Sequence, residues 1–249
     1  MGQELYFRLG GDGGRLLTDK IMINRAEIVQ DVHEDFIHAG AQIITTNTYM
    51  LDRSKLEKAG LGHECGVVKI KVGQLACQAR EKSNTNVEIA EVLPPLFGRF
   101  SKPIWVSWAL QDNGSKILRS SDSLTKAHDT LKGQPVGALF VNCCSPESES
   151  AAIPEFVSLS GCPVGGLANG FKEIPIDWVS SDKIEALGRR EDLSKINYAS
   201  HVKNWIASFA RRVGGCCEIG RQRIAYLRQA LDEQRWPIRS YCITESIFS

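Results

Sequence analysis

Short apolar runs alternate with amphipathic stretches along most of this chain, and this alternation constrains the fold more than any other feature of the sequence. Runs that are apolar on both faces are typical of strands covered on both sides, and helical crossovers between strands impose parallel pairing. The pattern therefore predicts an α/β fold. The predicted strands are residues 5–9, 41–47, 87–92, 103–110, 136–142 and 162–167, and a run that leads into Cys216-Cys217. The predicted helices are residues 26–39, 64–82, 123–132, 148–159, 198–211 and 220–234.

One stretch breaks this alternation. Only residues 93–102 separate the runs at 87–92 and 103–110, and they contain Pro94 and Pro95 but no helical period. A parallel crossover normally needs about a dozen residues or more. We found no internal repeat and no linker, so the sequence predicts about seven strands in a single domain over residues 1–249, interrupted at this point.

The balance of charge excludes several classes of partner. Lys and Arg number 30 and Asp and Glu 29, so no basic stripe is present to bind nucleic acid or an anionic membrane. No run approaches the roughly 18 apolar residues of a membrane span. The N-terminal segment lacks the basic and apolar regions of a signal peptide. We expect a cytoplasmic protein whose partners are small molecules.

Four of the eight cysteines form two adjacent pairs, Cys143-Cys144 and Cys216-Cys217. Without a secretion signal, such pairs favour metal ligands or buried thiols over disulfides. Each pair follows a predicted strand, and the carboxyl ends of parallel strands share one face of a fold. Neighbouring residues of a regular strand point to opposite faces, so Cys216 and Cys217 reach one ion only if their strand ends or distorts at Gly214-Gly215.

If Cys143, Cys216 and Cys217 bind one metal ion, these three ligands would make a catalytic site. They leave a tetrahedral zinc ion one ligand short, and a soft sulfur set favours zinc over hard cations. An incoming thiol would complete the tetrahedron, lose its proton and become able to attack an activated methyl group. The simpler alternative is that these cysteines are buried apolar side chains, which is the role we expect for Cys144.

Seven segments, in order along the chain, resemble the homocysteine S-methyltransferase family, a zinc-dependent (β/α)8 barrel. The ITTNTY and GGCC motifs are the most specific of them. The segments are GGDGG at 10–14, AGAQIITTNTYM at 39–50, LPPL at 93–96, PIWVSWALQDNG at 103–114, VGALFVNCCSPE at 136–147, LANGFKE at 167–173 and RRVGGCCEIG at 211–220. The resemblance implies a TIM-type (β/α) barrel and a Zn²⁺ cofactor.

The resemblance also implies roles for individual residues. The zinc ligands would be Cys143, Cys216 and Cys217. The substrate would lie against Asp12 and Gly13 through its amino-acid part, against Thr46 and Asn47 at a strand end, and near Asn142, which would orient a ligand. A simpler reading makes Asp12 a turn residue and the strand-end groups ordinary polar side chains, and Asn169-Gly170 a turn.

The chain departs from the family in three places. Relatives continue after LPPL with a helix, a strand whose glutamate binds the substrate's ammonium group, and another helix; residues 97–102 replace all of it. Loss of that unit predicts an incomplete barrel, with Glu91 or Asp112 as the candidates to replace the glutamate. Relatives have other residues where this chain has 15–17 after DGG and 218–221 after GGCC.

The function implied by the resemblance is zinc-dependent methyl transfer to the thiol of homocysteine, giving methionine. The length of the chain favours a small donor, S-methylmethionine or S-adenosylmethionine, over a folate or cobalamin module, and betaine is less favoured. The missing strand supports an alternative, a catalytically weakened zinc- or thiol-binding member of the family. A third reading is a structural α/β protein with incidental cysteines.

Overall fold

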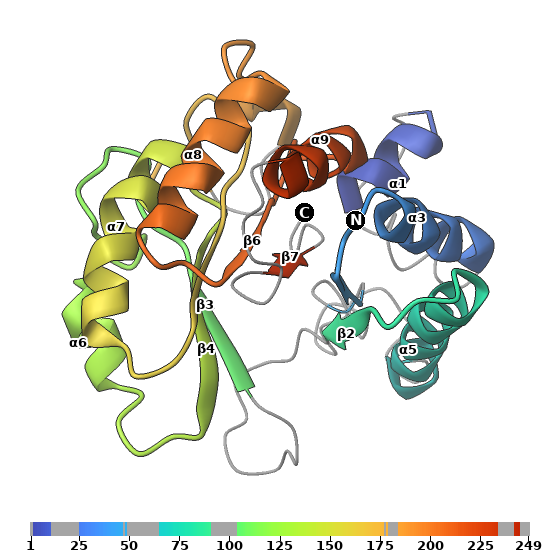
Figure 1. The fold of residues 1–249 in the computed structure, drawn as a ribbon, viewed down its shortest axis with the longest axis horizontal. Helices are drawn as coiled ribbons and strands as arrows, with labels where there is room; N and C mark the ends of the chain where they lie inside the picture. Colours follow the sequence, from blue (N-terminus) through green and yellow to red (C-terminus); the bar gives the residue numbers. More distant parts are fainter. Residues whose placement is uncertain are drawn as a thin grey trace.

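The fold is a seven-stranded parallel sheet covered by helices, as seen in a computed structural model (Figure 1). The structure describes residues 2–10, 25–46, 48, 65–90, 104–176, 178, 184–233 and 242–244. The strands are β1 (Ile43–Thr45), β2 (Glu88–Ala90), β3 (Ile104–Trp108), β4 (Val136–Asn142), β5 (Val164–Leu167), β6 (Arg212–Gly214) and β7 (Cys242–Thr244). All pairs between them are parallel, which confirms the predicted α/β class.

The strands succeed one another in a cyclic order, β2-β1-β7-β6-β5-β4-β3. The last strand, β7, lies between the first strand, β1, and β6, so the order closes on itself except between β2 and β3. Consecutive βα units in a barrel give this order. The described residues of β2 and β3 form the two ends of the sheet, and the sheet is not closed into a complete barrel. The opening falls at the segment where the sequence predicted an interruption.

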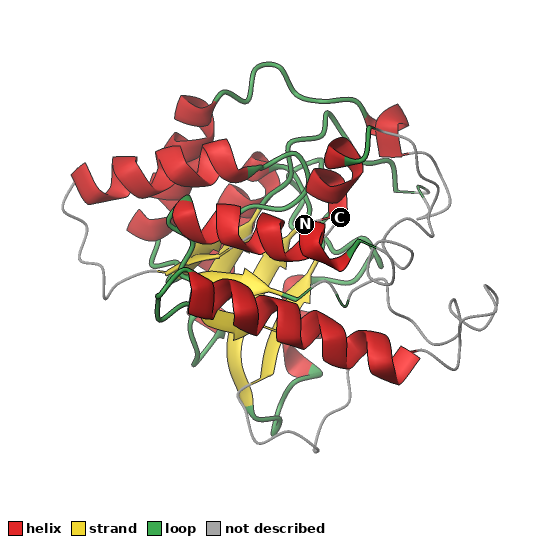
Figure 2. Ribbon diagram, turned by 90° about the vertical axis from the view of Figure 1, so that its right-hand side faces the viewer, coloured by secondary structure: helices red, strands yellow, loops and turns green. Residues whose placement is uncertain are grey.

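The helices surround the sheet, with α6, α7 and α8 beside β3 to β6, and α1, α3 and α5 beside β1 and β2 (Figures 1 and 2). Most of them lie close to their predicted positions. Their bounds are α1 (Gly2–Arg8), α3 (Ala26–His38), α5 (Cys65–Lys82), α6 (Leu124–Asp129), α7 (Pro146–Leu159), α8 (Lys195–Ala207) and α9 (Arg221–Glu233), with a 3-10 turn at η2 (Ile184–Leu187). None of the described helices is long and apolar enough to cross a membrane.

The prediction of a strand at residues 5–9 is wrong, because α1 occupies this segment. Only one side of the segment is buried in the fold: Leu5 is fully buried, whereas Phe7 is largely exposed. Glu4 and Arg8 form an ion pair one helical turn apart, which supports the helix. The count of seven strands was nevertheless right, because β7, which the sequence did not predict, takes the place of this strand.

Alternation along β4 separates the two faces of the sheet. Leu139 and Val141 pack in the apolar cluster beneath α6 and α7. Ala138 and Phe140 face the other way and meet Trp105 of β3. Asn142 follows the same alternation and ends the strand on this inner face. The side chains on the inner face of β4 therefore lead to Asn142 at the carboxyl end of the strand.

A buried carboxyl group lies beneath those strand ends. Glu149 of α7 is fully buried, and its Oε1 atom accepts a weak hydrogen bond from the Cys144 thiol at 3.7 Å. Its Oε2 atom has no hydrogen-bond partner. Burial raises the pKa of Glu149 well above its usual value of 4.5, so this group keeps its proton in the folded state.

Replacement of Glu149 by Gln is expected to stabilise the protein increasingly as the pH rises. Above pH 4.5 the carboxyl ionises in the unfolded chain but not in the folded one, so the natural protein loses stability with rising pH and the neutral amide does not. Urea unfolding of both proteins from about pH 5 to about pH 8 measures the difference. Unfolding free energies that differ by a constant amount over this range would show that Glu149 ionises normally.

Candidate metal centre

Three cysteine thiols meet at the carboxyl ends of β4 and β6. Cys143 directly follows β4, and Cys216 and Cys217 lie just beyond Gly214, the last residue of β6. The Sγ atoms of Cys143 and Cys217 are 3.9 Å apart, and those of Cys216 and Cys217 are 3.7 Å apart. Among the residues that the structure describes, these three form the single group with the spacing of metal ligands. The convergence predicted from the sequence is confirmed.

The sulfur spacing fits a tetrahedral metal ion. With a Zn–S bond of about 2.3 Å, two ligands of a tetrahedral ion lie about 3.8 Å apart. Both measured separations fall within 0.1 Å of that value. The donor set of three sulfurs suits a soft ion such as zinc.

Backbone hydrogen bonds beyond the end of β5 hold the two cysteine segments side by side. The amide of Cys143 donates to the carbonyl of Leu167 at 3.1 Å, and the amide of Cys216 donates to Ala168 at 2.8 Å. Gly170 then donates to the carbonyl of Cys217 at 2.8 Å. The segment 167–170 thus joins residues 73 positions apart, and it does more than the simple turn that the sequence suggested.

The end of β6 explains how adjacent cysteines reach one point. Regular strand geometry stops at Gly214, which meets the condition set by the sequence. At Gly215, a Cβ atom would lie 2.2 Å from the side chain of Ile219, so only glycine fits. Cys143 adopts a left-handed backbone conformation, with φ of 52°, a strained state for a residue other than glycine. The backbone conformations at Cys143 and Gly215 thus direct the three thiols toward one another.

The thiols differ in their acidity. Hydrogen bonds from Cys216 and Cys217 lower the pKa of Cys143 well below its usual value, and the charge of Arg119 and the amide of Asn169 add to this effect. The pKa of Cys216 is raised well above its usual value, first by burial and then by the neighbouring sulfur atoms. The pKa of Cys217 is also raised, chiefly by its contact with Cys143. Cys143 is therefore the most acidic of the three thiols.

The predicted substrate-binding residues are only partly covered by the structure. Asn142 is buried, and its amide points at the Sγ atom of Cys216 at 4.0 Å, not at the neighbouring Cys143. Thr46 is also buried at the end of β1, where its hydroxyl lies 3.1 Å from that of Thr48. Asp12, Gly13 and Asn47 lie outside the described residues. Their predicted roles stay predictions.

Asp112 takes no part in replacing the family's glutamate, because its carboxylate is already fully engaged. It accepts backbone hydrogen bonds from Ser145 at 2.5 Å and from Ile174 at 2.8 Å, and it pairs with Arg119 at 3.4 Å. Its side chain is only 2% exposed. Glu91, the other candidate, lies outside the described residues.

Asp112 instead joins the two loops around the thiol of Cys143. Ser145, two residues after Cys143, is the N-cap of α7, and Ile174 belongs to the apolar wall that packs on the cysteines. Arg119 also reaches the carbonyl of Cys143 at 3.5 Å. The sequence did not predict this structural role, because its signal there is only an acidic residue in a polar segment after a strand.

An apolar wall covers the thiol cluster, and it contains Phe171, Ile174, Leu187 and Trp178. Trp178 is a half-buried member of this wall. Cys144 points away from the cluster into the apolar core between the sheet and α7, which confirms its predicted packing role. The thiols therefore lie in a largely dry environment, with Cys143 the most accessible of the three.

The fold and site together define an α/β protein that gathers three cysteine thiols at the carboxyl edge of a parallel sheet. The chain belongs to the homocysteine S-methyltransferase family, whose sequence profile matches residues 1–100 and 96–231. Three crystal structures of the homocysteine methyltransferase MmuM from Escherichia coli share the fold. The metallated form has a TM-score of 0.72 and 20% identity, covering 92% of this chain and 93% of that one.

The other two forms of MmuM are similar to this chain to a lesser degree. The oxidised form has a TM-score of 0.69 and 20% identity over 92% of this chain and 93% of that one. The apo form has a TM-score of 0.61 and 21% identity over 92% of each chain. The search of curated proteins gave no match.

Replacement of Asp112 by Asn is expected to reduce the free energy of unfolding by about 2–3 kcal/mol, because a buried charged acceptor of two backbone amides is lost. Denaturant unfolding measures the change. Asp122→Asn is the matched control, since Asp122 lies in the same segment and pairs only with the exposed Lys126 and with Ser120. A loss no larger than that of the control would contradict the role of Asp112.

Proposed function

We propose that this protein transfers a methyl group to the thiol of homocysteine, giving methionine, with zinc bound by Cys143, Cys216 and Cys217. The observation that carries the proposal is the thiol cluster, whose sulfur spacing matches that of zinc ligands. Membership of the family supports homocysteine as the substrate. The existence of a metallated crystal form of MmuM, which shares the fold, supports metal binding.

The chemistry is one displacement. Zinc, when bound, is a Lewis acid that keeps an incoming thiol deprotonated at neutral pH. The substrate sulfur forms a bond to the methyl carbon, the bond between that carbon and the donor's sulfonium sulfur breaks, and its electron pair stays with the leaving sulfur. The thiol proton goes to solvent.

The residues of this chain hold and shield the reacting sulfur. Asn142 fixes the position of Cys216, and Arg119 balances part of the negative charge of three thiolates. The apolar wall around Trp178 excludes water from the sulfur cluster. By resemblance to the family, the substrate would contact Thr46 at the end of β1, together with Asp12, Gly13 and Asn47.

The scaffold that best accounts for these positions is a single TIM-type barrel over residues 1–249 that lacks one βα unit. The cyclic strand order and its opening between β2 and β3 support this interpretation. The donor is a small sulfonium compound, S-methylmethionine or S-adenosylmethionine, because its leaving group is already activated. The same opening favours the second candidate function, a zinc-binding member of the family without efficient turnover.

Purified protein is expected to contain one zinc per chain and to form methionine from homocysteine with a sulfonium donor. Cys217→Ser should lose both the metal and the activity, because a hydroxyl is a poor zinc ligand. Metal analysis and methionine assays with S-methylmethionine, S-adenosylmethionine and betaine measure the two properties. Cys162→Ser, a half-buried thiol outside the cluster, is the control. Full zinc without turnover would establish the second function, and full zinc in Cys217→Ser would refute the ligand assignment.

Zinc binding near neutral pH is expected to release about two protons, because two of the three thiols have a raised pKa and must ionise to bind the metal. The apparent affinity for zinc should therefore fall as the pH falls. Calorimetric titration in two buffers of different ionisation enthalpy counts the protons. Heats that are the same in both buffers would show that the thiols are already ionised.

A further inference from the structure

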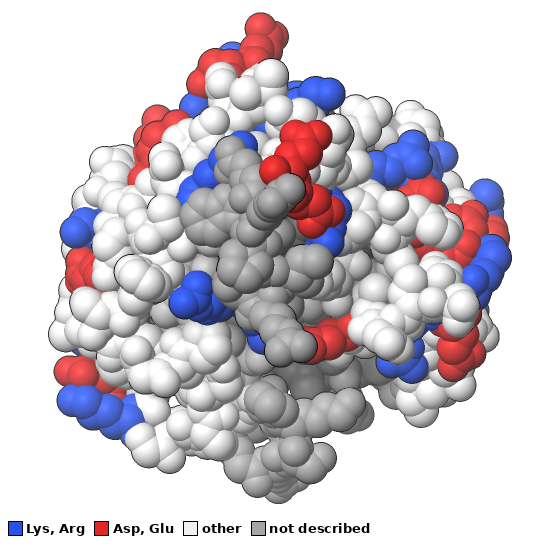
Figure 3. All heavy atoms as spheres, in the orientation of Figure 1, with Lys and Arg blue, Asp and Glu red and all other residues white. Residues whose placement is uncertain are grey.

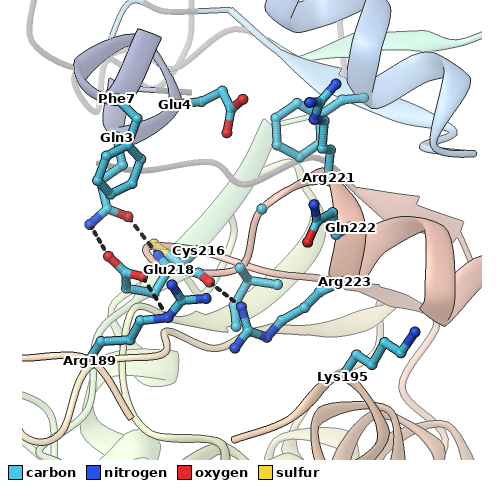
Figure 4. A pocket seen from close by; sticks show the side chains of 13 residues that line it. Gln3, Glu4, Phe7, Arg189, Lys195, Cys216, Glu218, Arg221, Gln222 and Arg223 are labelled. Atoms are coloured by element: carbon cyan, nitrogen blue, oxygen red, sulfur yellow. Dashed lines mark hydrogen bonds and ion pairs between the residues drawn. The ribbon is translucent and has the colours of Figure 1, made fainter. Parts of the chain in front are cut away.

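A cavity of about 430 Å³ adjoins the thiol cluster on the side of α1 (Figure 4). Its walls are α1, the turn after β6 and the first turn of α9, and Cys216 also lines it. The chain builds this cavity from two segments that distinguish it: α1, which forms where a strand was predicted, and residues 218–221, which depart from the family after GGCC. The cavity is therefore built from segments that are particular to this chain.

Contacts across the cavity hold its floor in place. Glu218 adopts a left-handed conformation, with φ of 64°. The side chain of Gln3 accepts a hydrogen bond from the Glu218 amide at 2.6 Å and donates one to its carboxylate at 3.0 Å. Arg189 pairs with the other carboxylate oxygen at 3.3 Å. Figure 4 shows these three side chains meeting at one edge of the cavity. The contacts with Gln3 and Arg189 thus fix the turn at Glu218 before any ligand binds.

The cavity has an excess of positive charge. Among the described residues, its lining includes the cations Arg189, Lys195, Arg221 and Arg223 and two carboxylates, Glu4 and Glu218. Glu4 already pairs with Arg8, and Arg221 pairs with Asp35 outside the cavity. Within the described lining, Glu218 is thus the carboxylate left to balance Arg189, Arg223 and Lys195.

Two of these cations have no carboxylate partner among the described residues. Arg223 donates to the carbonyl oxygens of Glu218 and Leu193, at 2.9 and 2.8 Å, and its buried Nε atom has no partner. Burial and the neighbouring Arg189 lower the pKa of Arg223, a sign that its charge is poorly compensated. Lys195 lies over the ring of Tyr226 at 5.0 Å and forms no ion pair.

We propose that this cavity binds a small oxyanion, a molecule that carries a carboxylate or phosphate group, between Arg189, Lys195 and Arg223. An oxyanion between these three cations would balance their charge through charge-assisted hydrogen bonds. The amino end of α9, a helix of 13 residues that starts at Arg221, adds a favourable dipole at the same place. The volume admits a molecule of metabolite size.

This proposal goes beyond methyl transfer and does not depend on it. It is tested on the zinc-loaded protein by calorimetric titration with inorganic phosphate and, separately, with acetate, at constant low ionic strength set with chloride. The two titrations distinguish a phosphate from a carboxylate ligand. Lys195→Gln and Arg189→Gln are suitable variants, because both side chains are exposed and neither holds a metal ligand.

One of the two anions is expected to bind saturably with one site per chain. Each cavity variant should weaken this binding about tenfold or more, since a charge-assisted hydrogen bond is lost. Lys132→Gln, at an exposed lysine outside the cavity, should leave it unchanged. Binding that does not saturate, that survives both cavity variants or that falls equally in Lys132→Gln would overturn the proposal. The methionine assay is a separate measurement, so its failure leaves this result unaffected.

Discussion

The structure of the metal centre depends on the parallel register of β4, β5 and β6. These strands are immediate neighbours, so their carboxyl ends lie at one edge, and the backbone bonds of residues 167–170 extend that edge beyond the sheet. Side chains on the inner face of β4 lead to Asn142, and the next residue, Cys143, carries one of the three thiols. Were the register of β5 to slip by one residue, the inward and outward sets would exchange, and the thiols would separate.

Charge around the centre is arranged in a small number of buried contacts. Asp112 binds two backbone amides and Arg119, and Arg119 in turn faces Cys143. Glu149 lies deeper, and its burial raises the pKa of its carboxyl, which disfavours a further negative charge beside the thiols. Elsewhere on the face shown in Figure 3, acidic and basic side chains of the described residues are interspersed.

The opening between β2 and β3 and the replacement of the first predicted strand by β7 are two different departures from a complete barrel. The first follows from missing residues, because no segment between β2 and β3 is long enough for a strand and its helices. The second follows from the N-terminal segment folding as α1, which leaves the place beside β1 to the C-terminal strand. The second departure also shapes the cavity beside Cys216, because α1 forms one of its walls.

The sequence by itself determined the α/β class, the position of most helices and the set of cysteines that converge. Apolar periodicity and strand-end placement suffice for these, because they are local patterns that parallel pairing repeats from strand to strand. Only the tertiary structure decided that most of residues 5–9 form a helix. The pattern of Leu5 and Phe7 is compatible with a strand or a helix, and packing against α3 and α9 buries one side of this segment. The tertiary structure also decided the roles of Asp112, Gln3 and Glu218, whose partners lie 33, 215 and 215 residues away, beyond the reach of any local pattern.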